Sequence, residues 1–170
     1  MKTTYRFTEE DERQIQALAR ARNYHKVREG IASKKYDDSK SEREVHEKGL
    51  RGELAAARLL GLSVDQRPRR NGDGGADLKF ECGLTCEVRY RTVRGYDFAL
   101  GSASVDSLRA DVGVLMWPAQ AGSGAELVGW TSRVHVALQG KTKNYGHGDR
   151  LVVEPSDLLA PRSLFSLVRN

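Results

Sequence analysis

The spacing of apolar side chains predicts two charged helices in the first part of the chain. Thr8 stands before a run of acidic residues and a thin apolar stripe, which predicts a capped helix over roughly residues 9–30. A second amphipathic stretch predicts a helix over residues 42–60 that stops at Gly61. Between the two helices the chain is polar and without periodicity, so we interpret residues 1–40 as a charged helix followed by a flexible, exposed loop.

After the second helix the pattern changes to short strands. They are predicted at residues 77–80, 84–91, 98–100, 111–117 and 126–131. The fourth of these runs is almost unbroken apolar sequence, as expected at the centre of a sheet that is covered on both faces. The helix and the strands together predict an α/β domain over residues 41–170, in which helices flank a central mixed β-sheet.

The last part of the chain contains shorter elements. Ser132 is predicted to cap a helix that runs to about residue 138. Residues 141–150 are predicted to form a basic loop that contains glycine. A short strand at 151–154 and a helical turn at 156–159 are predicted to follow.

Composition adds little to this picture. The 170 residues carry a net charge of +5 and give a pI near 9.3, which favours acidic partners such as nucleic acid only mildly. No apolar run approaches the roughly 18 residues that a membrane-spanning helix needs. The first residues also lack the apolar core of a secretion signal. We therefore expect a cytoplasmic protein without a membrane partner.

Glu53 is the unexpected residue of the second helix. Its neighbours three and four positions away are all small or apolar: Gly49, Leu50, Ala56 and Ala57. A carboxylate on a buried stripe is costly unless it is paired or bound to a metal. Arg51 and Arg58 belong to the same helix but lie off this stripe, so neither is an obvious partner.

Candidate chemistry follows on two adjoining predicted strands. Asp77 opens the first, while Glu87 and Arg89 lie two residues apart on the next and therefore share a face. Two carboxylates and the backbone carbonyl of Val88 offer the oxygen ligands that Mg²⁺ or Mn²⁺ takes, and a cation beside them suits the transition state of phosphodiester hydrolysis. Glu53 would reach in from the helix and hold a second metal or a coordinated water.

These residues, in this order, resemble the restriction-endonuclease-like PD-(D/E)XK nuclease superfamily. The resemblance rests on the helical Gly-Glu pair in GLRGELAAARLLG, on Asp77 opening a strand and on the Glu-Val-Arg sequence that ends the next. It covers roughly residues 42–135 and implies a helix, a three-stranded meander, a crossover helix and a further strand. It also implies a metal-dependent catalytic site formed by Glu53, Asp77, Glu87 and Arg89.

The resemblance further implies a deoxyribonuclease that uses Mg²⁺ or Mn²⁺, with DNA favoured over RNA and internal cleavage favoured over exonuclease action. Enzymes that act on duplex DNA often work as dimers, so a homodimer is compatible with it. The candidate nucleic-acid-binding residues are the cations Arg67, Arg69, Arg70, Arg91, Arg94, Lys141 and Lys143. An ordinary solvated position is the alternative for each of them.

Two positions depart from the family pattern. Ala76 stands in place of the proline, and Arg89 stands in place of the lysine. Arginine keeps the positive charge, but its pKa above about 12 prevents it from shuttling a proton. One alternative is therefore a nucleic-acid-binding protein of the same fold with weakened or lost cleavage. Another is an interaction protein whose carboxylates form ordinary turns and ion pairs.

Overall fold

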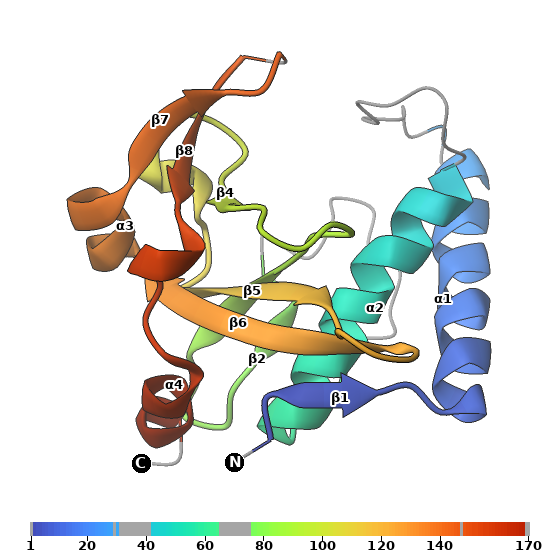
Figure 1. Ribbon diagram of the computed structural model, residues 1–170. Coiled ribbons are helices and arrows are strands. Elements are labelled where there is room, and N and C mark those ends of the chain that lie inside the picture. The colour runs from blue at the N-terminus through green and yellow to red at the C-terminus, as the bar shows by residue number, and fades with distance from the viewer. Residues whose placement is uncertain (1, 29, 31–41, 65–75, 147, 169–170) are drawn as a thin grey trace.

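The computed structural model describes residues 2–28, 30, 42–64, 76–146 and 148–168 (Figure 1). The strands are β1 (Thr4–Arg6), β2 (Leu78–Lys79), β3 (Thr85–Tyr90), β4 (Phe98–Ala99), β5 (Val112–Pro118), β6 (Gly124–Ser132), β7 (Lys141–Asn144) and β8 (Asp149–Val153). The helices are α1 (Glu9–Arg28), α2 (Glu42–Leu60), α3 (Arg133–Gln139) and α4 (Pro161–Val168), with 3₁₀ turns at Val105–Ser107 and Pro155–Asp157. Within the described ranges, no helix has the length and apolar character that crossing a bilayer requires.

Five strands form the central sheet in the order β1-β6-β5-β3-β2. β3 and β5 run parallel, whereas the other neighbours are antiparallel, which confirms the predicted α/β class and the mixed sheet. β5 lies in the middle of the sheet, because the apolar side chains of its run can be buried on both faces of the sheet. Val112, Val114 and Met116 are buried on one face of the sheet and Leu115 on the other.

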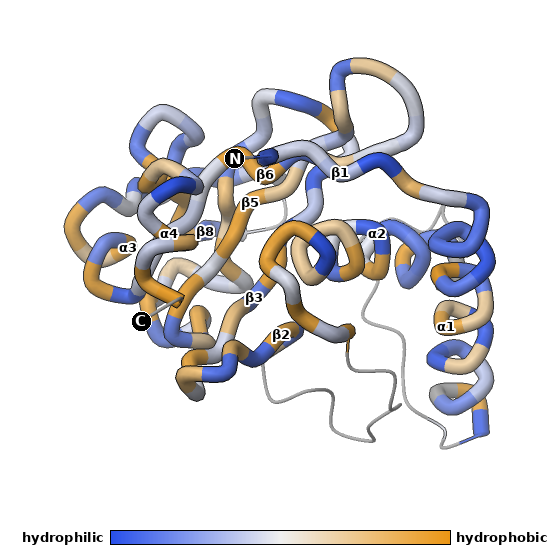
Figure 2. Tube along the Cα trace, turned by 90° about the horizontal axis from the view of Figure 1, so that it is seen from below, coloured by the Kyte–Doolittle hydropathy of each residue, from blue (hydrophilic) through white to orange (hydrophobic). Residues whose placement is uncertain are grey.

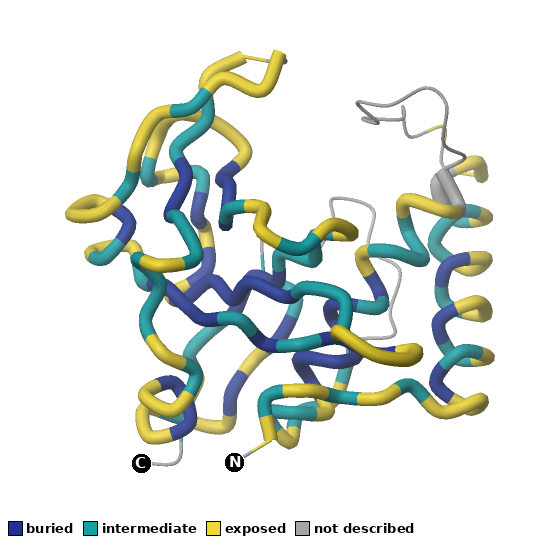
Figure 3. Tube along the Cα trace, in the orientation of Figure 1, coloured by how far each residue is buried: buried dark blue, intermediate teal, exposed yellow. Residues whose placement is uncertain are grey.

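α2 covers one face of the central sheet, and α1 lies along the outer side of α2 (Figure 1). α2 approaches β3 closely at Gly52, where an added Cβ would lie 2.4 Å from the Cβ of Tyr90. α1 is hydrophilic along most of its length (Figure 2) and buries the stripe that faces α2 (Figure 3). The buried side chains of this helix contact are Ile15, Ala19, Leu50 and Leu54.

The residues before α2 contribute both a strand and a helix to this arrangement. β1 pairs with β6 at the edge of the central sheet. α1 begins as predicted, because Thr8 Oγ1 accepts the N–H of Asp11 (3.1 Å) while Asp11 Oδ2 accepts the N–H of Thr8 (2.9 Å). The division of the chain near residue 40 stays a prediction, but β1 and α1 both pack on elements from beyond that boundary.

The other face of the central sheet meets a three-stranded antiparallel sheet of order β4-β8-β7. Phe98, Leu115 and Val153 are buried together between the two sheets. The approach is close at Gly113, where an added Cβ would lie 2.2 Å from the ring of Phe98. The β7–β8 hairpin projects away from the central sheet, at the end of the molecule opposite α4 (Figure 1).

Two predictions about the connection after β3 are wrong. The predicted strand at 98–100 does not complete a meander, because β4 joins β8 in the second sheet. No crossover helix lies between β3 and β5; residues 91–111, all of them described, contain only the 3₁₀ turn and β4. The segment 101–107 is rich in glycine and serine, which compete with helix formation through their own turns.

The predicted loop at 141–150 is also wrong, because most of it forms the β7–β8 hairpin. β7 has the sequence Lys-Thr-Lys-Asn, which contains no apolar alternation to mark it as a strand. Its pairing partner β8 supplies the burial through Val152 and Val153. Gly146 (φ 87°) and Gly148 (φ 92°) provide the left-handed backbone that the turn requires.

Candidate active site

Asp77 lies next to Glu87, where the chain enters the β2–β3 hairpin. The strand pairing begins at Leu78 with Cys86, and the N–H of Asp77 donates to the carbonyl of the same Cys86 (2.8 Å). The carboxylate of Asp77 accepts the N–H of Val88 in turn (2.6 Å). Asp77 therefore contacts the backbone of both residues that flank Glu87 in β3.

The surroundings of these two acids agree with that placement. Burial raises the pKa of the Cys86 thiol, and the charges of Asp77 and Glu87 raise it further, so both carboxylates lie near the same sulfur atom. The N–H and the C=O of one strand residue point in the same direction. Since the N–H of Val88 points to Asp77, the carbonyl of Val88 is directed toward the same edge.

β3 presents its alternate side chains to two different layers. Val88 and Tyr90 contact α2 around Gly52, whereas Glu87 and Arg89 alternate with them and point to the opposite face. Glu87 is only 7% exposed and forms an ion pair with Arg89. The Nε of Arg89 is buried and meets no acceptor among the described residues. Because a buried donor without an acceptor is costly, this guanidinium has unused capacity for an anion.

Glu53 is buried on α2, as its sequence neighbours predict, and its partner is an arginine of α1. Arg22 donates from Nη1 to Glu53 Oε1 (3.1 Å) and from Nη2 to Oε2 (2.9 Å), so both carboxylate oxygens are engaged. This fork geometry is the strong form of an arginine–carboxylate pair. Glu53 therefore belongs to the contact between the helices, on the side of the sheet that Glu87 does not face.

The described residues contain no group of three acidic, histidine or cysteine side chains placed to hold one metal ion. Glu53, Asp77 and Glu87 are thus not gathered into one ligand set. Asp77 and Glu87 alone still fit a magnesium-type ion, because Mg²⁺ in phosphate chemistry is commonly held by one or two carboxylates together with substrate oxygens. The carbonyl of Val88 adds one further oxygen ligand to this pair.

The predicted cations have different surroundings. Arg67, Arg69 and Arg70 lie outside the described residues. Arg94 donates to Glu126 (2.7 Å) and to the carbonyl of Pro118 (2.7 Å), and its guanidinium lies over the ring of Trp117 (5.2 Å). These contacts give Arg94 a role in holding the β3–β4 connection against β5 and β6.

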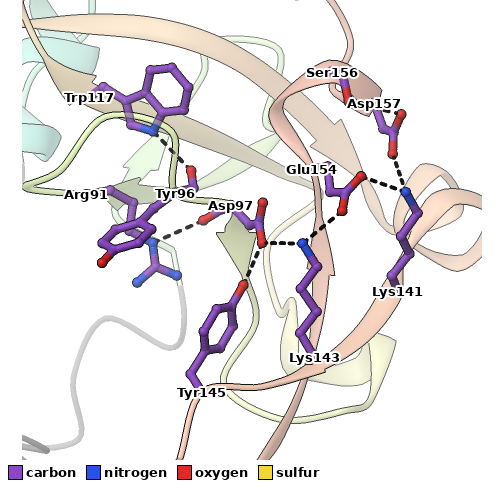
Figure 4. Close-up of polar contacts among 10 residues, drawn as sticks. All are labelled: Arg91, Tyr96, Asp97, Trp117, Lys141, Lys143, Tyr145, Glu154, Ser156 and Asp157. Atoms are coloured by element: carbon purple, nitrogen blue, oxygen red, sulfur yellow. Dashed lines mark hydrogen bonds and ion pairs between the residues drawn. The ribbon is translucent and has the colours of Figure 1, made fainter.

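The two lysines of β7 are paired with acids (Figure 4). Lys141 donates to Glu154 (2.7 Å) and Asp157 (3.2 Å). Lys143 donates to Asp97 (2.9 Å) and forms an ion pair with Glu154 (2.8 Å). Much of their charge is therefore neutralised within the second sheet and its connections.

Two arginines near these sites were not among the candidates from the sequence. Arg22 lies on a helix whose partner could not be inferred, although an arginine facing a buried glutamate is the expected solution. Arg150 lies in the segment predicted as a loop; as a β8 residue it pairs with Lys143 across the hairpin. Arg150 could have been selected from the sequence only if that hairpin had been recognised there.

No family model matches the chain, and a search of curated proteins finds no relative. The resemblance to the PD-(D/E)XK superfamily therefore stays a prediction that rests on the residues themselves.

Proposed function

We propose that the protein is a Mg²⁺- or Mn²⁺-dependent nuclease that hydrolyses phosphodiester bonds in DNA. The observation that carries the proposal is the position of Asp77, which hydrogen-bonds Cys86 and Val88 on either side of Glu87 in β3, with Arg89 on the same face as Glu87. The arrangement of α2, the hairpin and the parallel strand β5 also supports a restriction-endonuclease-like core, although the crossover helix of that pattern is absent from residues 91–111.

The roles follow from the chemistry of each group. Asp77, Glu87 and the carbonyl of Val88 would hold the metal ion, which when bound supplies Lewis-acid stabilisation of the phosphate oxygens. Arg89 places a fixed positive charge beside the scissile phosphate and, as an arginine, neither accepts nor releases a proton. Because Arg89 is paired with Glu87, a phosphate and a metal ion together would have to replace that ion pair. Glu53, held by Arg22, supports α2.

A second candidate is a nucleic-acid-binding protein of the same fold without cleavage. The ion pair between Arg89 and Glu87 favours this alternative, because it lowers the negative charge that Glu87 offers to a metal ion. A lysine at position 89 would present a compact ammonium, whereas the planar guanidinium is suited to binding phosphate. The two candidates share the substrate and differ only in the chemical step.

The test is nicking of supercoiled plasmid and cutting of linear DNA by the purified full chain in Mg²⁺ or Mn²⁺. Asp77→Asn and Glu87→Gln should each reduce cleavage at least about 100-fold, because each removes a carboxylate from the metal site. Glu81→Gln is the matched control, since Glu81 lies exposed in the turn of the same hairpin. It should leave cleavage unchanged.

Two outcomes separate the candidates. Binding of DNA without any nicking in either metal, even with protein in excess over plasmid, would overturn the nuclease and leave the binding protein. Arg89→Lys distinguishes them further. Increased cleavage in this variant would identify the chain as a weakened nuclease, whereas unchanged binding with no cleavage in both forms would support the second candidate.

A further inference from the structure

β1 is an outer strand of the central sheet, and the backbone on its outward side is unpaired. The carbonyl of Thr3 accepts the N–H of Leu127 (2.7 Å), and the N–H of Phe7 donates to the β5–β6 turn (3.1 Å). The odd-numbered residues of this segment therefore direct their backbone groups to β6, as alternate residues of an antiparallel pair do. Thr4 and Arg6 direct theirs away from the sheet, where no described residue bonds to them. Such a row of unpaired groups is a template for a further strand.

The side chains beside this edge carry positive charge. β1 alternates between exposed and half-buried residues (Figure 3). Lys2, Thr4 and Arg6 are the exposed set, and neither cation forms an ion pair with a described residue. Together they line a hollow of about 600 Å³ that also touches residues 119–121 and Glu126. Because the carboxylate of Glu126 is held by Arg94 (2.7 Å), the charge that remains in the hollow is positive.

The outer strand of the second sheet is different. β7 carries Lys141 and Lys143, and each is paired with Glu154 (2.7 and 2.8 Å). Lysines on an edge strand are a common protection against the addition of another strand. On β7 these charges are neutralised within the fold, whereas no described residue neutralises those beside β1. The other outer strands, β2 and β4, contain only two residues each.

A second copy of the chain suits the β1 edge poorly. In an antiparallel pairing of two β1 strands centred on Thr4, Lys2 of one copy would face Arg6 of the other. Like charges directly opposite each other destabilise a pair of strands. A strand with acidic side chains would instead form opposite-charge pairs with both cations.

We propose that β1 is a docking edge for an extended acidic segment of a partner protein, which adds to the central sheet as a further strand. The segment bonds to the outward backbone groups of Thr4 and Arg6. Two acids four residues apart lie opposite Lys2 and Arg6, and a serine or threonine midway between them lies opposite Thr4. In the order of the sheet β1 is three strands from β3, so this docking edge does not rest on the proposed function.

The test is fluorescence anisotropy with the full chain and a labelled peptide that contains the sequence Glu-Val-Thr-Val-Glu. Thr4→Pro should weaken binding at least about tenfold, because the proline ring replaces the outward N–H of the edge. The pairing with β6 does not use this N–H, so thermal unfolding should be little changed. Thr4→Val is the matched control, since it keeps the N–H and removes only the hydroxyl. It should leave the affinity within about threefold.

The charges are tested separately, so that the proposal stays falsifiable if Thr4→Pro does not fold. The original protein should bind the glutamate peptide about tenfold more tightly than Lys-Val-Thr-Val-Lys, and K2E/R6E should reverse this preference. Equal affinity of folded Thr4→Pro and Thr4→Val would overturn the strand addition. Equal affinity of the original protein for the two peptides would overturn the acidic partner.

Two further results would assign the edge to another occupant. A dimer of the original protein in analytical ultracentrifugation that Thr4→Pro dissociates, without any peptide binding, would replace the acidic segment with a second copy. Binding of a single-stranded oligothymidylate that K2E/R6E abolishes and Thr4→Pro leaves unchanged, without any peptide binding, would assign the cations to phosphate. The peptide assay contains neither DNA nor a metal ion, so its result is independent of the cleavage assay.

Discussion

The arginines between α1 and α2 and those at the end of β3 have opposite surroundings. The ion pairs that join the helices include Arg22–Glu53 at 2.9 Å, Arg51–Glu12 at 2.5 Å and Arg58–Asp11 at 3.5 Å. At the end of β3, Glu87 pairs with Arg89, while Arg91 has no carboxylate partner among the described residues. The named arginines of the helix layer are paired with acids, whereas Arg91 at the end of β3 is not paired with one among the described residues.

The difference is between arginines that are paired with acids within the fold and an arginine, Arg91, whose side chain is held only by a backbone carbonyl among the described residues. A buried carboxylate with two hydrogen bonds from a guanidinium is satisfied, and adding a metal ion there would require breaking them. A partly buried guanidinium without a carboxylate partner gains from an anion. Burial of a carboxylate is therefore not by itself a sign of a functional site, as Glu53 with its partner Arg22 shows.

Removing Arg22 is expected to have the largest effect on stability. Arg22→Met leaves the Glu53 side chain, which is 9% exposed, without its two hydrogen bonds from the guanidinium. A buried charge that loses its partner costs about 3–5 kcal/mol, and the partial exposure of Arg22 favours the lower end of that range. Urea unfolding followed by circular dichroism measures the change. Arg51→Met, which breaks a more exposed pair, should cost less than about 1 kcal/mol.

The double variant R22M/E53M tests the assignment of Glu53 to the helix layer. It replaces both charges with apolar side chains, so it should recover most of the lost stability. It should also keep the proposed cleavage activity, because Asp77 and Glu87 remain. A stable double variant that no longer cleaves DNA would instead place Glu53 in the active site.

Gly52→Ala probes the contact that separates the two layers and should have an intermediate effect. The new Cβ would lie 2.4 Å from the Cβ of Tyr90, so α2 must shift from β3, at a cost of about 1–3 kcal/mol. Gly49→Ala is the control on the same helix, since its nearest contact would be Glu53 Oε1 at 3.8 Å. It should stabilise the protein by about 0.5–1 kcal/mol through helix propensity. Equal effects of the two variants in thermal unfolding would argue against the close approach.

The smallest effect is expected from acid titration of the second sheet. Lys141 and Lys143 lower the pKa of Glu154 from 4.5 to about 2. A carboxylate whose pKa is lower in the folded state contributes stability above its unfolded pKa, and that contribution is lost as the pH falls from about 5 to about 2. The Tm difference between the original protein and Glu154→Gln should therefore shrink across this window. A difference that stays constant between pH 6 and pH 2.5 would contradict the two ion pairs.

Local signals in the sequence predict much of the fold. The bounds of α2, the central position of β5 and the cap of α3 at Ser132 are all confirmed; Ser132 Oγ accepts the N–H of His135 (3.2 Å). Each depends on neighbours in the chain: helical periodicity, an unbroken apolar run, and a capping side chain. β7 and β1 have no such local pattern. They are strands because they pair with β8 and β6.

The sequence by itself determined which residues are unusual: a carboxylate on an apolar helical stripe, and an acid pair with an arginine on adjoining strands. The tertiary structure alone decided their partners. Arg22 reaches Glu53 from a helix 31 positions away in the chain, and the β7–β8 hairpin carries Lys143 and Tyr145 to Asp97. Charge pairing acts over a few ångströms of space, whereas local sequence patterns extend over a few residues of chain, so the pattern identifies the charge and the fold selects its partner.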